Sequence, residues 1–251
     1  LFALPFTTYS QYQLPNPGFE NWESNGEPTG FHSYTTSTGR YAGTGQSSDF
    51  GDFLKRNSDI RPGSNGVYSC EILARKILIA IANGNLTTGQ IVAGSMTATD
   101  GNKNYNQSGP VYAGSQSFKG IPDSLTLWAK YIPKGSGDDV ARVNAVIHSN
   151  DNYHDPEGSG NYNNIKHSQA TIEYQATANK GWQRLSAPFS INNPSLTPAY
   201  ILISFTTNRT PGGGESGDAV YLDDIEFVYN SRLASLKVGG SDLTGFDKNT
   251  Y

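Results

Sequence analysis

Short alternating segments of apolar and polar residues, bounded by Gly, Pro or Asn, most constrain how this chain can fold. Every second residue is apolar in 125–131 and again in 141–147, and this period of two places the apolar side chains on one face of a strand. Further β-prone segments lie at 67–77, 86–99, 170–178, 182–191, 199–207 and 218–229. No segment keeps a period of 3.6 residues for three turns, so the sequence predicts an all-β chain.

The composition favours many short strands joined by turns. The chain has 28 Gly, 13 Pro and only one Met, and 12% of its residues are aromatic; Gly and Pro favour turns, whereas aromatic residues pack well on a pleated surface. Residues 23–66 are expected to form long loops with a short helical turn around 49–56, and 100–117 and 149–168 are expected to be polar loops. Strands with this spacing and long polar loops predict a jelly-roll β-sandwich.

Three segments are predicted along the chain. Residues 1–13 are expected to form an N-terminal arm, and 14–230 to form the jelly-roll domain. The segment 231–251 is too short to bury a core of its own. We interpret it either as a C-terminal hairpin that packs back on the body or as the start of a following β-sandwich domain.

Charge and cysteine content exclude several classes of protein. The net charge is −4, and no run of Lys or Arg exceeds two residues, so nucleic acid is not expected as a partner. The longest apolar stretch, 77–82, is too short to span a bilayer. A lone Cys70 excludes an intramolecular disulfide and a cysteine-based zinc cluster. Because the chain opens on Leu1 without a basic segment before an apolar one, we expect that any export signal has been removed.

Several short motifs resemble those of jelly-roll carbohydrate-binding modules with the galactose-binding-like fold. The motifs are Asn-Pro-Gly-Phe-Glu at 16–20 followed by Trp22, Leu-Thr-Leu-Trp-Ala-Lys-Tyr at 125–131, and Tyr-Leu-Asp-Asp-Ile-Glu-Phe at 221–227. More narrowly, 81–89 and the turn at 137–139 are similar to the putative carbohydrate metabolism domain family. This resemblance implies an exported glycan-handling protein of the periplasm or cell surface of a Gram-negative bacterium.

The resemblance also implies a structural calcium ion. In such modules an acidic residue near the N-terminal Gly-Phe-Glu shares the ion with one in the late Asp-Asp strand, which here gives Glu20 with Asp223 or Asp224. Calcium prefers six to eight oxygen ligands, and the carbonyl groups of 16–18 would add to the carboxylates. The alternative is that these carboxylates accept hydrogen bonds from loop amides or pair with an arginine.

Sugar recognition needs a flat aromatic ring beside side chains that form hydrogen bonds. The candidates for sugar binding come from two places. One is the polar loops that contain aromatic residues, and the other is the polar positions on the non-core face of the 140–148 strand. The predicted ligand-binding residues are Tyr34, Tyr105, Tyr112, Arg142, Asn144, His148, Tyr153 and His154. For each tyrosine the alternative is packing over an edge of the sandwich with a solvated hydroxyl group.

We therefore predict a module that binds poly- or oligosaccharides, with no catalytic residue identified. One alternative is a glycoside hydrolase with a pair of carboxylates, for which Glu71 and Glu173 are the strand carboxylates best able to lie on a sheet face. A second alternative is a structural or assembly module with flanking domains. Two close carboxylates would favour hydrolysis, and an exposed apolar patch near the tail would favour assembly.

Overall fold

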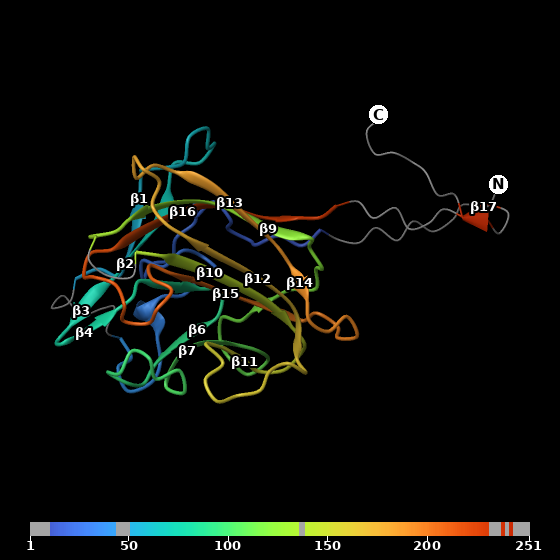
Figure 1. Ribbon diagram of the computed structural model, residues 1–251, viewed down its shortest axis with the longest axis horizontal. Helices are drawn as coiled ribbons and strands as arrows, with labels where there is room; N and C mark the ends of the chain where they lie inside the picture. The colour runs from blue at the N-terminus through green and yellow to red at the C-terminus, as the bar shows by residue number, and fades with distance from the viewer. Residues whose placement is uncertain (1–10, 44–50, 136–138, 231–236, 239–240, 243–251) are drawn as a thin grey trace.

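The computed structural model describes residues 11–43, 51–135, 139–230, 237–238 and 241–242. Two antiparallel sheets pack face to face, and a smaller third sheet lies below them in the view of Figure 1. The one helical element in the described part is a single 3-10 turn, η1 (Tyr34–Thr36). No described helix is long and apolar enough to cross a membrane.

The two main sheets form the sandwich. The five-stranded sheet has the order β1 (Leu54–Asn57), β2 (Ser69–Leu73), β16 (Ala219–Val228), β9 (Ser124–Ile132), β13 (Gln183–Pro188). The six-stranded sheet has the order β14 (Ser190–Ile191), β12 (Lys166–Tyr174), β10 (Ala141–His148), β15 (Tyr200–Thr206), β5 (Asn85–Thr87), and β8 (Gln116–Ser117) also pairs with β15. The predicted all-β jelly-roll sandwich is confirmed.

The core lies between these two sheets, where the alternating pattern predicted it. On β9 the side chains of Leu125, Leu127, Ala129 and Tyr131 are fully buried, as are those of Ala141, Val143, Ala145 and Ile147 on β10. Burial of each leucine, valine or isoleucine side chain among them contributes roughly 1.5–3 kcal/mol. The period-two pattern therefore fixes which face of each strand points into the sandwich.

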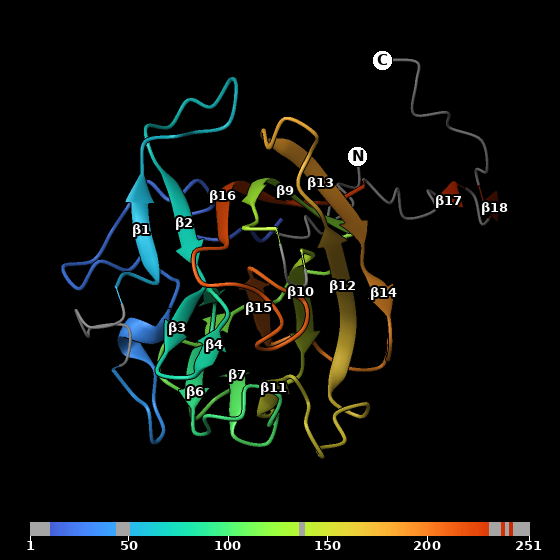
Figure 2. The ribbon, with the colours of Figure 1, turned by 60° about the vertical axis from the view of Figure 1, so that its left-hand side comes forward.

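A third layer covers part of the outer face of the six-stranded sheet. It consists of β11 (Tyr153–Asp155), β7 (Asn104–Ser108) and β6 (Gln90–Ala93). Beside it lies the hairpin of β3 (Arg75–Ile77) and β4 (Ala80–Ala82), which comes forward in Figure 2. The rest of the outer face of the six-stranded sheet is not covered by this third layer.

Four local predictions are corrected. The segment expected to be a helical turn around 49–56 contains strand β1, and the two polar loops at 100–117 and 149–168 contain β7 and β11. The single strand expected at 182–191 is divided at Phe189: β13 belongs to the five-stranded sheet and β14 to the six-stranded sheet. Phe189 is buried in the core, so this segment crosses from one sheet to the other.

The two ends of the chain are described only in part. Most of the predicted N-terminal arm, residues 1–10, lies outside the described residues, but Gln13 exchanges hydrogen bonds with the backbone of Phe227 at 2.6 and 2.8 Å. In the tail, β17 (Lys237–Val238) pairs with β18 (Ser241–Asp242). The rest of 231–251 and the turn residues 136–138 lie outside the described residues.

Candidate functional site

A cavity lies on the outer face of the six-stranded sheet, between the third layer and the β3–β4 hairpin. Its volume is about 350 Å³, which is in the range of pockets that hold small ligands. Apolar walls come from the hairpin and the loop after β6, and polar side chains from β7, β10 and β15 form the floor. The apolar and aromatic lining includes Tyr34, Tyr41, Ile77, Ile81, Met96 and Tyr105.

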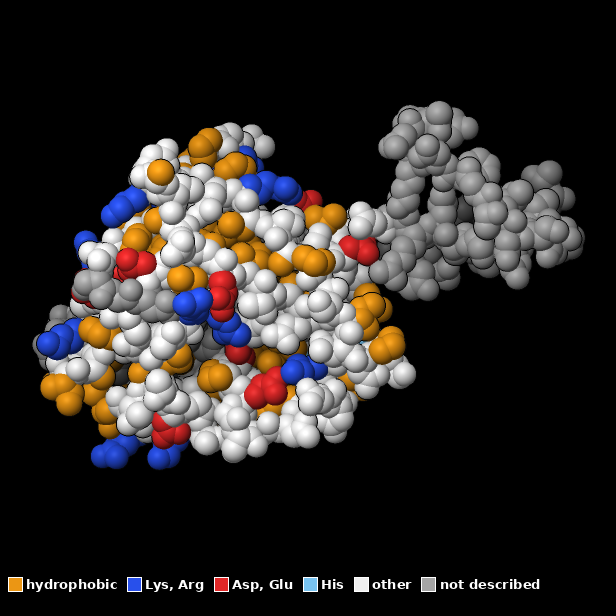
Figure 3. All heavy atoms as spheres, in the orientation of Figure 1, with side chains coloured by type: hydrophobic (Ala, Val, Ile, Leu, Met, Phe, Trp, Pro, Cys, Tyr) orange, Lys and Arg blue, Asp and Glu red, His pale blue; other side chains and the backbone are white. Residues whose placement is uncertain are grey.

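Two arginine–carboxylate pairs provide the charges at this site. The Arg142 guanidinium lies 3.6 Å from a carboxylate oxygen of Asp155, which is buried, and Arg209 lies 3.2 Å from Glu173. Arg142 and Glu173 are direct partners across β10 and β12. Figure 3 shows acidic and basic side chains gathered near the middle of this face. Glu173 lies outside the lining and neutralises Arg209, which lies within it, so the two pairs together carry no net charge.

Asparagine side chains hold the parts of the cavity together. The amides of Asn85 and Asn106 exchange hydrogen bonds at 2.9 and 3.1 Å, and Asn106 also donates to Ser204 at 2.8 Å. Asn104 fixes the loop after β6 by donating to two of its carbonyl groups, those of Ser95 and Thr97. The polar floor is therefore rigid because its amides are already hydrogen-bonded to one another.

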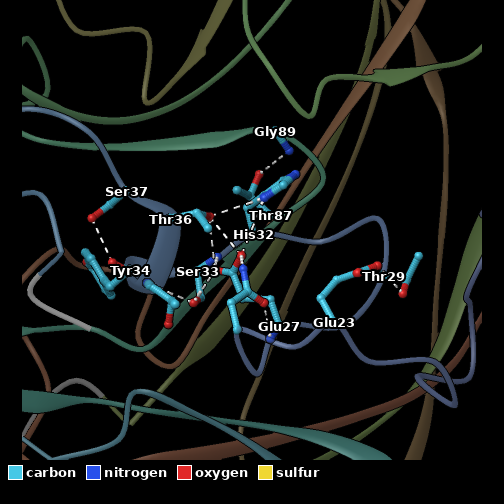
Figure 4. Close-up of polar contacts among 12 residues, drawn as sticks. Glu23, Glu27, Thr29, His32, Ser33, Tyr34, Thr36, Ser37, Thr87 and Gly89 are labelled. Atoms are coloured by element: carbon cyan, nitrogen blue, oxygen red, sulfur yellow. Dashed lines mark hydrogen bonds and ion pairs between the residues drawn. The ribbon is translucent and has the colours of Figure 1, made fainter. Parts of the chain in front are cut away.

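A buried carboxylate positions Tyr34 at the cavity wall. Glu27 accepts hydrogen bonds from the Ser33 amide and hydroxyl group, both at 2.6 Å, and from the Thr36 hydroxyl group (Figure 4). Ser33 in turn caps η1, the 3-10 turn on which Tyr34 lies. Burial raises the pKa of Glu27, but hydrogen bonds from His32, Ser33 and Thr36 outweigh burial and hold it below the ordinary value. Burial raises the pKa of Tyr34 to about 12.

An aromatic cluster extends from the cavity along the third layer. The ring of Tyr105, which lines the cavity, stacks on His154 with centroids 4.2 Å apart and planes 14° from parallel. His154 contacts the hydroxyl group of Tyr162 through Nδ1 at 3.0 Å and that of Tyr112 through Nε2 at 3.4 Å. Burial lowers the pKa of His154. Four of the predicted residues, Tyr34, Tyr105, Tyr112 and His154, thus lie in or beside the cavity.

Three other predicted residues are buried in structural positions. His148 and Asn144 are buried on β10, because β7 and β11 cover a face that a two-layer sandwich would leave open. Tyr153 lies on β11 itself, where its side chain is buried against Val146 and Leu202 of the six-stranded sheet. His148 Nδ1 lies 3.0 Å from the Ser149 carbonyl oxygen, so it carries the proton and Nε2 accepts from Ser108. Burial lowers the pKa of His148 to about 4. Of the predicted β10 residues, Arg142 lines the cavity.

The predicted calcium ligands have other partners. Glu20 accepts hydrogen bonds from the amides of Val67 and Tyr68, Asp223 accepts from the Arg61 amide, and Asp224 forms an ion pair with the Arg61 side chain. Among the described residues, no group of three or more His, Cys, Asp or Glu side chains could hold a metal ion. These contacts are those of the alternative interpretation, in which the carboxylates accept from loop amides or pair with an arginine, and calcium binding stays a prediction.

The two strand carboxylates considered for hydrolysis do not form a pair. Glu71 lies on β2 of the five-stranded sheet, where it accepts hydrogen bonds from Asn57 and Tyr221. Glu173 lies on β12 of the six-stranded sheet and pairs with Arg209. Since the two residues belong to opposite layers of the sandwich, they cannot act on one glycosidic bond.

Comparison with known proteins supports the fold. A structure described as a putative glycoside hydrolase from Bacteroides thetaiotaomicron matches with a TM-score of 0.54 and 16% identity, over 71% of this chain and 57% of that one. No protein-family model matches the chain, and no curated protein matches its sequence. The match to the Bacteroides structure spans little more than half of that protein and shows a common fold alone.

Two carbohydrate-binding modules match with lower TM-scores. A module solved with β-1,4-galactotriose matches 88% of this chain and 100% of its own at 13% identity and a TM-score of 0.38. A module specific for non-crystalline cellulose matches 90% of this chain and 99% of its own, at 13% identity and a TM-score of 0.40.

Several cavity residues were missed by sequence reasoning. Asn106, Asp155 and Arg209 come from segments expected to be loops or strand ends, and no spacing in the sequence links them. Asn85 lies on β5 and Asn106 lies on β7. Only the packing of the third layer on the six-stranded sheet brings these two side chains together.

Proposed function

We propose that this chain is a non-catalytic carbohydrate-binding module that holds an uncharged oligosaccharide in the cavity on the six-stranded sheet. The proposal rests on the cavity lining, in which aromatic walls at Tyr34, Tyr41 and Tyr105 stand beside a rigid polar floor around Arg142. A pyranose has apolar C–H faces with hydroxyl groups around its rim. Such a ring can pack on a tyrosine while its hydroxyl groups bond to the floor.

The charge balance supports an uncharged ligand. Asp155 and Glu173 each lie beside an arginine, so an acidic sugar would meet two carboxylates as well as two guanidinium groups. A neutral sugar hydroxyl can donate to a carboxylate and accept from an arginine at the same time. Recognition of this kind needs no net charge on the ligand.

The aromatic cluster beside the cavity supports a ligand longer than one sugar. The half-buried rings of Tyr112, His154 and Tyr162 continue from Tyr105 along the third layer. A chain with one unit in the cavity would pass over these rings. We therefore expect affinity to rise with chain length up to the length of this surface.

A glycan array with product analysis tests the proposal. Tyr105→Ala and Arg142→Ala should each weaken binding of an array hit at least tenfold, about 1.4 kcal/mol, in isothermal titration. Arg56→Ala is the matched control, because Arg56 lies on β1 of the other sheet and covers the Tyr68 ring. Equal affinity of all three variants would contradict the proposed site.

Hydrolysis is the second candidate function, and the Bacteroides match favours it only through the shared fold. Release of shorter products from an array hit would replace the binding proposal with an enzymatic one. Asp155→Asn and Glu173→Gln would then be the first variants, since both carboxylates lie at the cavity or pair with residues that line it. Binding without products would leave the non-catalytic function in place.

A further inference from the structure

We propose a second carbohydrate-binding site on the outer face of the five-stranded sheet, centred on Trp128. A hollow of about 360 Å³ lies there, and its lining includes Arg61, Thr126, Trp128, Arg184, Asp224 and Glu226. These residues belong to the sheet opposite to the one that forms the cavity floor. The two sites would therefore face away from each other across the core.

An irregularity in β16 shapes this hollow. Between Asp223, opposite Trp128, and Glu226, opposite Thr126, two β16 residues face one β9 residue, which is a β-bulge. Asp224 within the bulge has a left-handed backbone with φ of 44°, a conformation that costs roughly 1 kcal/mol or more for a residue other than Gly. The bulge brings the side chains of Asp224 and Glu226 to the same hollow.

The side chains suit a neutral sugar. Trp128 supplies a half-buried indole ring, and the Arg61 guanidinium lies 5.5 Å from its centroid. Arg61 pairs with Asp224, and Arg184 lies 4.0 Å from Glu226. Two arginines and two carboxylates again balance, so the hollow offers donors and acceptors around an aromatic ring without a net charge that would select an ion.

The exposed pair is the part that a ligand would rearrange. The Arg184 and Glu226 side chains are about half exposed, so their ion pair is weak in water. A sugar hydroxyl group could replace that contact at little cost. Arg61, anchored by Asp224 and by the Pro62 carbonyl group, would stay in place.

Tryptophan fluorescence separates this site from the cavity. The chain has three tryptophans, and none of them is among the described residues that line the cavity. We expect β-1,4-galactotriose, mannohexaose or another neutral oligosaccharide from a panel to change the emission of the intact chain at millimolar concentration. Trp128→Phe should abolish that change.

Trp182→Phe is the matched control. Trp182 lies near the same sheet face but outside the hollow, where it donates to Asp59, and this variant should keep the response. Arg142→Ala should also keep it, because that variant alters only the cavity. Titration calorimetry should give two equivalents of glycan for the intact chain and one for Trp128→Phe.

The outcomes distinguish the two sites. A change in emission that persists in Trp128→Phe, or no change with any oligosaccharide in the panel, would overturn the second site and leave the cavity untouched. Loss of one of the two equivalents in Arg142→Ala, with an unchanged tryptophan response, would confirm both sites. If Trp128→Phe unfolds at a lower temperature than the intact chain, Glu226→Gln provides the second variant, with a weaker response expected.

Discussion

At the scale of single residues, Glu27 shows how a buried charge can organise a surface. Its carboxylate is almost fully buried, and it accepts hydrogen bonds from Ser33, which precedes η1, and from Thr36 within η1 (Figure 4). Hydrogen bonds to charged groups contribute about 1.5–3 kcal/mol each. Tyr34 reaches the cavity because this carboxylate fixes the turn before it.

Replacing this charge should destabilise the fold in a pH-dependent way. Glu27→Gln should lower the free energy of unfolding by about 2 kcal/mol at pH 7. Because the folded pKa of Glu27 lies below its ordinary value, its contribution is present above about pH 4.5 and is lost as the pH falls through the folded pKa. The difference between the variant and the intact chain should therefore shrink in acid.

Urea unfolding at pH 7 and at pH 3 checks this expectation. Glu23→Gln is the control, since Glu23 is exposed and accepts one hydrogen bond, from Thr29 at 2.6 Å. It should change the free energy of unfolding by less than about 1 kcal/mol. If Glu27→Gln changes the free energy of unfolding as little as the control does, the hydrogen bonds to Glu27 do not stabilise the η1 turn.

At the scale of elements, strands buried on one face were predicted well and the third layer was not. The strands β9 and β10 carry a period-two apolar pattern, so their faces could be assigned from sequence. In contrast, β7 and β11 are polar, with the sequences Asn-Tyr-Asn-Gln-Ser and Tyr-His-Asp. Their contacts with the six-stranded sheet are polar except for Tyr153, which packs on Val146 and Leu202. Such short, mostly polar strands have no apolar period to detect.

The unexpected third layer also explains why only some of the candidate site residues were predicted correctly. Aromatic residues in polar loops pointed to Tyr34, Tyr105, Tyr112 and His154, which do gather around the cavity. His148 and Asn144 were placed on the correct face of β10, but the layer that buries them was not expected. The local sequence predicts on which face of a strand a side chain lies. Whether that side chain is buried depends on segments that are distant in the sequence.

The attachment of β7 to the sandwich gives a second test. Asn106→Ala would leave the Asn85 amide and the Ser204 hydroxyl group without their partner in a buried place. Each buried group left unpaired costs about 1–3 kcal/mol, so we expect a loss of about 2–4 kcal/mol in urea unfolding and weaker glycan binding.

Gln107→Ala on the same strand is its control. The Gln107 amide bonds to Gln90 within the third layer and does not bridge to the six-stranded sheet. We expect a loss of about 1 kcal/mol and unchanged glycan binding. If both variants lose stability and affinity equally, the third layer is not held by Asn106 in particular.

At the scale of the whole molecule, two buried groups act in opposite directions on the pH dependence of stability. Burial lowers the pKa of His148 to about 4, so its contribution is complete above about pH 6.5 and is lost as the pH falls toward 4. Burial raises the pKa of Asp223 to about 6, so the folded state takes up a proton there and gains stability as the pH falls from 6 to 4.

These two contributions partly offset each other, and a single substitution can remove one of them. Asp223→Asn removes one term, so its free energy of unfolding should fall more steeply between pH 7 and pH 4 than that of the intact chain, by about 2–3 kcal/mol. Urea unfolding at several pH values measures both slopes, and the comparison holds whatever the variant's stability at pH 7. Parallel profiles would show that Asp223 ionises normally in the folded chain.

The position of the cavity has a consequence for how such a protein can adapt. Among the described residues, none that lines the cavity belongs to the apolar core between the two sheets. Residues such as Ile81, Met96 and Tyr41 can therefore be exchanged without opening a void in that core. A mutant library confined to these walls should contain mostly folded members, so selection could change the preferred sugar while the scaffold stays the same.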